Sequence, residues 1–284
     1  MTPLSILLLF WGSPLSLAWA YPLSIPQTSP VYDAVRTSRE ITIDGNLDEP
    51  AWAAAPWTGE FVDILGGDAP APPLRTRAKI LWDDDKLYIG AEMEEPHLWA
   101  TLTEQDAIIY RDDDFEVFLD PDGDGLRYFE IEVNAFGAVL DLFLSEPYNR
   151  GGRADLGWQA AGLEVGVSLT GTVNDPRDQD QGWSVELAIP WRGLVPPGER
   201  SAGAPGKPPE PGESWRMNFS RVDWPLEVAE GSYRKAEVPS RENRHPESNW
   251  VWSPQGSINM HIPERWGVVR FLMDPQNSPS NDCP

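Results

Sequence analysis

Residues 127–134 read Arg-Tyr-Phe-Glu-Ile-Glu-Val-Asn, and this stretch predicts the fold class more directly than any other. Apolar and polar side chains alternate along it: Phe129, Ile131 and Val133 against Glu130, Glu132 and Asn134. A period of two residues is typical of a β-strand with one apolar and one polar face. The stretch 115–120, Phe-Glu-Val-Phe-Leu-Asp, loses this alternation after Val117, which predicts a strand buried on both faces.

Short runs rich in β-branched and aromatic residues continue on both sides of this pair. They occupy residues 75–82, 86–92, 138–144, 163–169, 183–189, 215–220 and 266–272. The helical pattern is poor, since only 96–105 and 191–194 have room for a turn or two. Many short strands and few helices predict an all-β fold, an antiparallel β-sandwich of immunoglobulin-like or jelly-roll-like type. Long loop inserts are expected at 196–212 and 225–249.

Four segments are expected along the chain. They are a signal peptide at 1–20, an irregular lead-in at 21–39, a single domain at 40–272 and a disordered tail at 273–284. The apolar run 4–11 and the small-x-small sequence Ala-Trp-Ala at 18–20 are typical of a cleaved signal peptide. Cleavage predicts export, either secreted or to the periplasm and cell envelope, with no membrane insertion afterwards. An uncleaved anchor is the alternative.

The charge balance excludes some partners. The chain has 284 residues, with 45 acidic and 22 basic side chains and a formal net charge of −23. Such a surface repels phosphate backbones and anionic lipid headgroups, so nucleic acid and polybasic membrane attachment are both disfavoured. An apolar fraction of 40% permits a sizeable core, and the 14 Trp are unusually many.

Catalytic signatures are sparse. The chain has three histidines and one cysteine, Cys283, so it has no disulfide, Cys-based zinc cluster or buried thiol nucleophile. It lacks the Gly-x-Ser-x-Gly, His-Glu-x-x-His and phosphate-loop motifs. Two carboxylates suffice for a glycosidase, but 45 acidic residues make that signal unspecific. A non-catalytic protein is therefore expected.

Two acidic turns are candidates for calcium. Asp120, Asp122 and Asp124 alternate with Pro and Gly, a spacing that converges oxygen ligands on a hard cation. Asp44 and Asp48 lie in a second turn, directly after an apolar run. In both places a turn stabilised by its own Asp side chains is the alternative.

Aromatic residues beside carboxylates form a third candidate site. Tyr110 and Arg111 precede the acidic run 112–116, and Trp250 and Trp252 share one face of an extended segment. An exposed aromatic ring offers a flat surface to the C–H face of a sugar, and carboxylates, Asn and Arg bind hydroxyls. Burial of these aromatics in the core is the alternative.

Five blocks follow one another in a recognisable order. They are Ile-Thr-Ile-Asp-Gly-Asn-Leu-Asp-Glu-Pro-Ala-Trp at 41–52, Lys-Ile-Leu-Trp-Asp at 79–83 with Leu-Tyr-Ile at 87–89, Asp-Asp-Phe-Glu-Val-Phe-Leu-Asp at 113–120, Trp-Ser-Val-Glu-Leu-Ala-Ile-Pro-Trp at 183–191, and Trp-Val-Trp-Ser at 250–253 with Pro-Glu-Arg-Trp-Gly at 263–267. Over 40–272 the chain resembles the family 9 carbohydrate-binding modules and the wider group of exported family-9-like domains.

The resemblance implies a β-sandwich with structural calcium and a sugar slot between two aromatics that accepts a glycan end. It assigns the aromatics to Tyr110, where sugar-binding members carry Trp, and to Trp252. It assigns hydroxyl binding to Glu116 and Asn134, with Arg111 a further contributor. Glu132 stands where the family carries Arg, replacing a forked donor with an acceptor, which leaves the ligand preference open.

Relatives of this fold, including the DOMON type, also bind haem through Met, His or Lys. Met93, Met217 and the pair Met260-His261 are available, although packing is the simpler role for Met260 and haem is not expected. The sequence therefore predicts an exported, non-catalytic carbohydrate-binding domain linked to polysaccharide capture or catabolism. A haem-binding electron-transfer domain and an accessory or hydrolytic glycan-processing protein are the alternatives.

Overall fold

The computed structural model describes residues 28–199, 206–237 and 245–274. The predicted signal peptide and most of the predicted tail lie outside these residues. Within the described ranges, no helix combines the length and the apolar character needed to cross a membrane.

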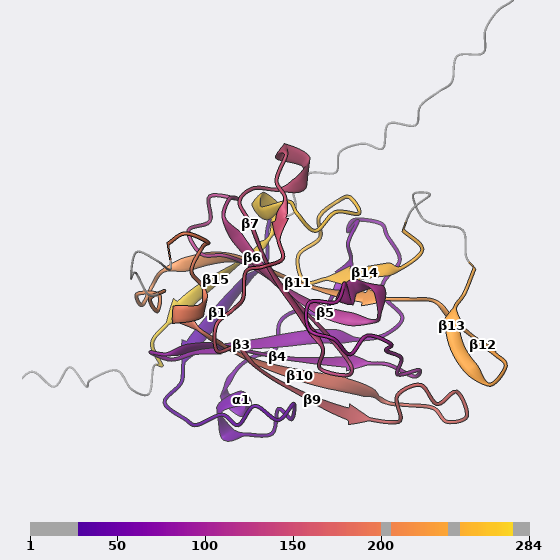
Figure 1. Cartoon of the computed structure of the whole chain (residues 1–284). Coiled ribbons are helices and arrows are strands. Elements are labelled where there is room, and N and C mark those ends of the chain that lie inside the picture. The colour runs from indigo at the N-terminus through magenta and orange to yellow at the C-terminus, as the bar shows by residue number, and fades with distance from the viewer. Residues whose placement is uncertain (1–27, 200–205, 238–244, 275–284) are drawn as a thin grey trace, which may run out of the picture.

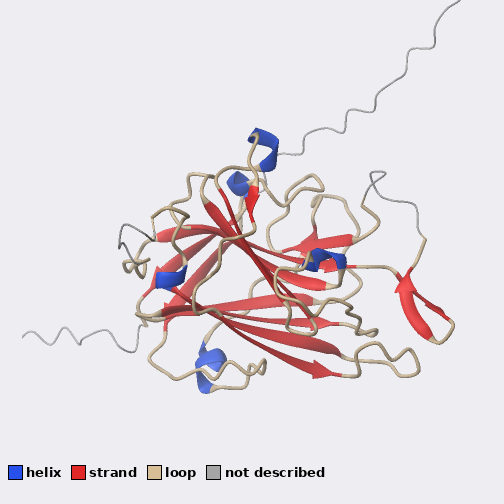
Figure 2. Cartoon of the chain, viewed as in Figure 1, coloured by secondary structure: helices blue, strands red, loops and turns tan. Residues whose placement is uncertain are grey.

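Regular structure is almost entirely β-strand (Figure 1; Figure 2). The strands are β1 (Val31–Arg36), β2 (Val62–Asp63), β3 (Thr76–Trp82), β4 (Lys86–Glu94), β5 (Asp114–Asp120), β6 (Tyr128–Asn134), β7 (Val139–Leu144), β8 (Ala154–Asp155), β9 (Glu164–Thr170), β10 (Gly182–Pro190), β11 (Ser214–Asp223), β12 (Leu226–Ala229), β13 (Ser232–Lys235), β14 (Ser248–Val251) and β15 (Gly267–Leu272). The helical segments are α1 (Pro50–Ala54) and the 3-10 helices η1 (Ile109–Arg111), η2 (Tyr148–Arg150), η3 (Trp191–Gly193) and η5 (Pro263–Arg265).

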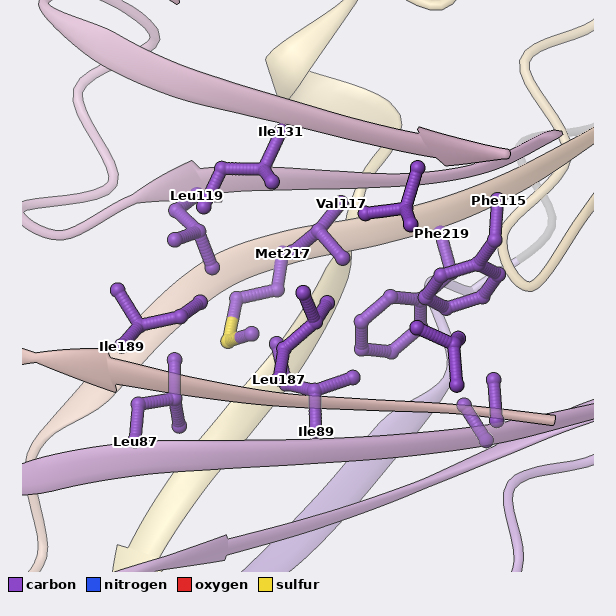
Figure 3. Packing of buried hydrophobic residues seen from close by; sticks show 14 of the residues in the cluster. Leu87, Ile89, Phe115, Val117, Leu119, Ile131, Leu187, Ile189, Met217 and Phe219 are labelled. Carbon is purple, nitrogen blue, oxygen red and sulfur yellow. The ribbon is translucent and has the colours of Figure 1, made fainter. Parts of the chain in front are cut away.

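Thirteen of the described strands form one curled sheet, in the order β8-β7-β6-β5-β11-β15-β1-β3-β4-β10-β9, with β14 and β2 branching from β11. The sheet folds over itself, so that β5, β6 and β11 face β4 and β10 across a shared apolar core. Figure 3 shows side chains of both halves pointing toward one another, among them Ile89, Val117 and Met217. The prediction of an all-β sandwich is confirmed, with one refinement: β1 pairs in parallel with β15 and β3, so the sheet is mixed.

The predicted irregular lead-in is wrong for Val31–Arg36, which form strand β1. This strand completes the sheet between β15 and β3. Its inward side chains Tyr32 and Ala34 are buried, while the other positions are partly or fully exposed. Pro and Ser residues before the strand obscured a short alternation that is stabilised by its neighbours rather than by local sequence.

The long insert expected at 225–249 contains regular strands in its described residues, 225–237 and 245–249. It begins with the hairpin of β12 and β13, which projects from the main sheet, and ends in β14 (Figure 1). Of the two expected helical turns, 191–194 contains η3, whereas 96–105 is irregular. The insert expected at 196–212 is described only in part.

Strands β5 and β6 are buried on both faces, as the stretch 115–120 predicts. Their inner side chains join the main core. On the outer face, Phe118 and Tyr128 belong to a second apolar cluster with Ile109 and Trp266, contributed by segments that cover the sheet. Carboxylates on this outer face are therefore enclosed rather than exposed to bulk water.

Candidate ligand-binding site

Four carboxylates gather on the outer face of β5 and β6, and we call them the acidic cluster. They are Asp114, Glu116, Glu130 and Glu132, each no more than 6% exposed. The ladder explains the grouping, because Glu116 lies directly opposite Glu132 and the other two are cross-strand or same-strand neighbours on that face. Sequence reasoning selected Glu116 and Glu132 but missed Asp114 and Glu130, although their positions in the two-residue period place them there.

Burial dominates the electrostatics of the acidic cluster. It raises the pKa of Glu116 and of Glu132, and the neighbouring carboxylate charges raise the pKa of Glu132 further. The pKa values of Asp114 and Glu130 lie well above their usual range for the same two reasons. In the described part of the chain, no lysine, arginine or histidine forms an ion pair with any of the four.

Tyr110 lies beside the acidic cluster, as the aromatic-carboxylate pattern predicts. It belongs to η1 and is 46% exposed. Its backbone N–H donates to Glu132 Oε2 at 2.9 Å, and its carbonyl oxygen accepts a hydrogen bond from Trp224 Nε1 at 2.9 Å. Arg111 follows it and is exposed. The tyrosine ring is thus available at the surface while its backbone is fixed to the cluster.

Tyr148 is a second exposed aromatic near the same carboxylates, and sequence reasoning missed it. It begins η2, after strand β7, and is 47% exposed. Burial raises its pKa to about 12, and the charges of Glu130 and Glu132 and the nearby Tyr110 add to this rise. The Tyr148 ring lies 4.4 Å from that of His261, which in turn packs against Phe118 and Tyr128 on the outer face of β5 and β6. No local pattern in the sequence marks Tyr148, because only the tertiary fold brings its turn to this face.

Trp252 does not provide the expected aromatic platform. It is only 6% exposed and belongs to the main core. Its ring lies 5.7 Å from that of Phe219 and so close to Gly267 that a Cβ at that glycine would collide with it. The two-residue period put Trp250 and Trp252 on one face, but that face is the inner one. The alternative of core aromatics therefore holds for both.

Asn134 also differs from its expected role. Its amide donates to Leu102 O at 2.8 Å and Asp112 Oδ2 at 3.0 Å, and its Oδ1 accepts from the N–H groups of Phe136 and Ala138. Two donors and two acceptor positions are the whole capacity of an amide side chain. Asn134 is therefore saturated by its own chain and fixes the loop before η1 instead of a ligand.

Beside the acidic cluster lies a second buried acid group, which we call the arginine network. It consists of Glu95, Asp113, Arg221 and Asp223. Arg221 is 1% exposed, and its Nη2 donates to Glu95 at 2.5 Å and to Asp223 at 2.8 Å. Its Nη1 donates to the Glu94 carbonyl at 2.7 Å. Burial raises the pKa of Glu95 to about 7 even though the guanidinium opposes the shift.

The two predicted calcium turns have different geometries. Asp120, Asp122 and Asp124 do place one carboxylate oxygen each within 4.8 Å of the others. Asp120, however, already accepts the N–H groups of Gly123 and Gly125, both at positive φ, which is how a self-stabilised turn is built.

The first turn brings Asp44 together with Glu49 and Glu186, within the same 4.8 Å, whereas Asp48 is exposed and lies outside the group. Glu186 accepts hydrogen bonds from Trp52 Nε1 at 2.6 Å and from the N–H groups of Gly45 and Asp44 at 2.8 and 2.9 Å. Burial nevertheless raises its pKa to about 7. Glu49 Oε2 is buried and has no hydrogen-bond partner.

The methionines considered for haem are buried in apolar clusters. Met93 and Met217 belong to the main core and Met260 to the second cluster. His261 lies between aromatic rings, with that of Tyr148 at 4.4 Å, and burial lowers its pKa to about 4. Its Nδ1 is 3.0 Å from the Tyr128 hydroxyl. Packing accounts for these side chains.

Comparisons with known proteins agree on the architecture. The model of the carbohydrate family 9 binding domain-like family matches residues 43–206, more than half of the chain. Among curated proteins, Exoglucanase XynX of Acetivibrio thermocellus is 26% identical over 153 residues, which is 54% of this chain and 12% of that protein. The chain thus spans about an eighth of this much longer relative.

Two solved structures share the fold at low sequence identity. A Bacteroides uniformis protein described as a candidate carbohydrate binder has a TM-score of 0.58 and 16% identity, covering 86% of this chain and all of its own. A family 9 carbohydrate-binding module of Caldicellulosiruptor kristjanssonii, in complex with cellotriose, has a TM-score of 0.52 and 16% identity, covering 90% of this chain and 99% of its own. Its complex with glucose has the same TM-score.

Proposed function

Because this chain belongs to the carbohydrate family 9 binding domain-like family, we propose that it is a non-catalytic domain that binds the end of a glycan. The acidic cluster and the two exposed tyrosines, Tyr110 and Tyr148, form the site. Cellotriose and glucose, the sugars bound by the Caldicellulosiruptor module, are the first ligands to test.

One observation carries this proposal: two half-exposed aromatic rings lie over the same outer face of β5 and β6 as the enclosed carboxylates. Tyr110 and Tyr148 are 46% and 47% exposed, and both interact with Glu132 or its neighbour Glu130. A tyrosine ring offers an apolar face to the C–H side of a sugar, together with a polar edge. Carboxylates accept hydrogen bonds from hydroxyl groups, and such charge-assisted bonds are the strong ones.

Tyr148 replaces Trp252 as the second aromatic of this proposal, and Asn134 is left out of the ligand contacts. Arg111 remains a candidate donor because it is exposed next to Tyr110. Weak affinity is expected, on the order of 10–1,000 μM, because a single sugar platform buries little area.

Export and a link to polysaccharide catabolism belong to the same proposal. The family match and the long curated relatives, one of them an exoglucanase, support a role beside carbohydrate-degrading enzymes. Any hydrolysis is assigned to a partner, because the binding assignment needs no catalytic group from this chain.

Structural calcium is also part of the proposal. The group of Asp44, Glu49 and Glu186 fits a hard cation best, because Glu49 Oε2 is buried without a hydrogen-bond partner. Those three carboxylates would hold the ion against the turn that precedes α1. The second predicted loop, with Asp120, Asp122 and Asp124, is the weaker candidate because none of its carboxylate oxygens is buried without a hydrogen-bond partner.

Calorimetric titration with cellotriose tests the site. We expect binding by the wild type and at least a tenfold loss of affinity in Tyr110→Ala and in Tyr148→Ala. Trp57→Ala is the matched control, since Trp57 is a partly exposed aromatic that stacks on Arg77 and Lys79 of strand β3. Unchanged affinity in both tyrosine variants, or no binding of any glycan on an array, would reject the assignment.

A further inference from the structure

The acidic cluster contains a set of oxygen atoms that converge on one point. Asp114, Glu116 and Glu132 each offer one carboxylate oxygen, and these three atoms all lie within 4.8 Å of one another. Glu116 and Glu132 are directly paired across β5 and β6, and Asp114 lies two residues before Glu116 on the same face. The convergence is therefore fixed by the sheet and not by flexible loops.

These side chains are enclosed without a positive charge from the chain. Asp114 is 0% exposed, Glu132 2% and Glu116 6%, and among the described residues none of them forms an ion pair. Like charges directly opposite in a ladder destabilise it, and an uncompensated buried carboxylate is costly. The cluster is thus stable either with bound protons or with a bound cation.

Buried oxygen atoms without hydrogen-bond partners favour a bound cation over bound protons. Ser220 is 0% exposed and lies opposite Glu116 in the β5–β11 ladder, on the same face, where its hydroxyl interacts with the Glu116 carboxylate. Asp114 Oδ2 and Glu130 Oε2 are buried and have no hydrogen-bond partner. Buried polar atoms in folded proteins are nearly always satisfied, so two orphaned carboxylate oxygens within the acidic cluster indicate a missing ligand.

We propose that Asp114, Glu116 and Glu132 bind one hard divalent cation of the calcium class, with Ser220 and Glu130 completing its oxygen shell. The donor set consists of oxygen alone, without the His or Cys that zinc prefers. Calcium and magnesium are the divalent cations that prefer carboxylate and hydroxyl oxygens, and calcium accepts the less regular arrangement of such ligands.

The position of this ion connects it to the tyrosine-lined site. The backbone N–H of Tyr110 donates to Glu132 Oε2, so a charge held by Glu132 also fixes η1 and the exposed ring. Calcium therefore strengthens glycan binding, and this second arm, unlike cation binding itself, rests on the proposed function.

Calcium calorimetry on the chelator-stripped full chain tests cation binding. We expect Glu132→Gln to lose one calcium-binding event that the wild type has. Glu164→Gln is the matched control, because Glu164 is an exposed carboxylate on strand β9, and it keeps every event. Gln is nearly isosteric with Glu and removes a buried charge, so the variant folds, as a circular dichroism melt in chelator confirms. Identical isotherms for wild type and Glu132→Gln would overturn the proposal.

In a second variant, a positively charged side chain takes the place of the proposed metal ion. Glu132→Arg places a guanidinium next to Glu116, much as Arg221 serves the arginine network. We expect the same calcium event to disappear and the melting temperature in chelator to rise above that of the wild type. Retention of the event in Glu132→Arg would overturn the proposal as well.

Glycan titrations with and without calcium separate the two proposals. We expect cellotriose to bind the wild type at least fivefold more weakly in chelator. If Glu132→Gln loses a calcium event but no glycan binds under either condition, the proposed function fails and the cation site stands. If glycan binds equally in chelator and Glu132→Gln keeps the calcium event, the cation site fails alone.

Discussion

Asp113 and Asp114 are neighbours in the sequence, yet their carboxylates belong to two buried acid groups with different charge balance. Asp113 lies in the arginine network, where Arg221 donates to two carboxylates, and its own Oδ1 accepts the Trp224 N–H at 2.7 Å. Asp114 lies in the acidic cluster, where one of its oxygens has no partner. The peptide at the start of β5 thus lies between a group of carboxylates balanced by an arginine and a group that has no such balance.

The difference teaches that burial of acid is not itself a sign of a site. Carboxylates of the arginine network are buried against donors that the chain supplies. The acidic cluster is buried against other acids. A group whose compensation must come from outside the chain is the better candidate for a ligand.

Arg221→Leu is the strongest way to break this comparison, because it turns the arginine network into a second uncompensated acid group. We expect the free energy of unfolding to fall by about 3–5 kcal/mol, the usual result of removing one partner of a buried ion pair. Urea unfolding at neutral pH measures it. Arg75→Leu is the control: its ion pairs are exposed, so about 1 kcal/mol or less is expected. An equal loss of unfolding free energy in the two variants would show that the buried guanidinium contributes no more to stability than the exposed one.

The pH dependence of stability sharpens the comparison next. Burial raises the pKa of Glu116 to about 7 and, with nearby charge, that of Glu132 to about 8. Between about pH 4.5 and pH 8 the folded state then binds more protons than the unfolded state, so the free energy of unfolding falls as pH rises through this window. In chelator we expect a fall of several kcal/mol across this window, because each unit of pKa shift contributes about 1.4 kcal/mol.

Glu95 and Glu186 contribute to the same slope, since burial raises both pKa values to about 7. Glu132→Gln isolates the share of the acidic cluster, because it removes one of the titrating groups there and leaves the other three carboxylates in place. A slope that is the same in Glu132→Gln and in the wild type would mean that the acidic cluster is not the source.

The sequence predicted the strands and their polar faces better than it predicted how the strands pack against one another. Alternation in 127–134 placed Glu132 on a polar face, and the sandwich followed from the many short strands. Whether a face is inner or outer depends on pairing between distant strands, so Trp252 was assigned to a surface that it does not reach. Tyr148 lies on a turn whose position only the fold decides, and the role of Asn134 depends on the loop before η1.

Glu186→Gln, made within the proposed calcium group of Asp44, Glu49 and Glu186, tests a carboxylate whose oxygens already accept hydrogen bonds from the chain. Three donors converge on this carboxylate, and an amide there turns an N–H group toward at least one of them. We expect a loss of about 1–3 kcal/mol in the free energy of unfolding in chelator, from hydrogen bonds that leave buried donors unpaired. Glu132→Gln, measured the same way, is expected to cost nothing or to stabilise. An equal loss of unfolding free energy in the two variants would contradict the distinction between the two groups of carboxylates.

Tyr148→Phe probes the smallest difference, between the ring of this residue and its hydroxyl. Burial and the neighbouring Glu130 and Glu132 hold the pKa of Tyr148 at about 12, so the phenol stays neutral at any physiological pH. Because the proposed contact uses the ring face, removal of the hydroxyl should weaken cellotriose binding less than threefold, or by less than about 0.7 kcal/mol. Tyr148→Ala, in contrast, removes the face itself.

A tenfold loss of cellotriose affinity in Tyr148→Phe would show that the hydroxyl, and not the ring face, makes the main contact with the sugar. The acidic cluster would then act on the ligand through a tyrosine O–H rather than through a cation, because the charges of Glu130 and Glu132 raise the pKa of this hydroxyl. Repeating the titration of Tyr148→Phe in calcium and in chelator separates these routes. If the ion acts through Glu132 and η1, calcium strengthens binding by the same factor in Tyr148→Phe as in the wild type.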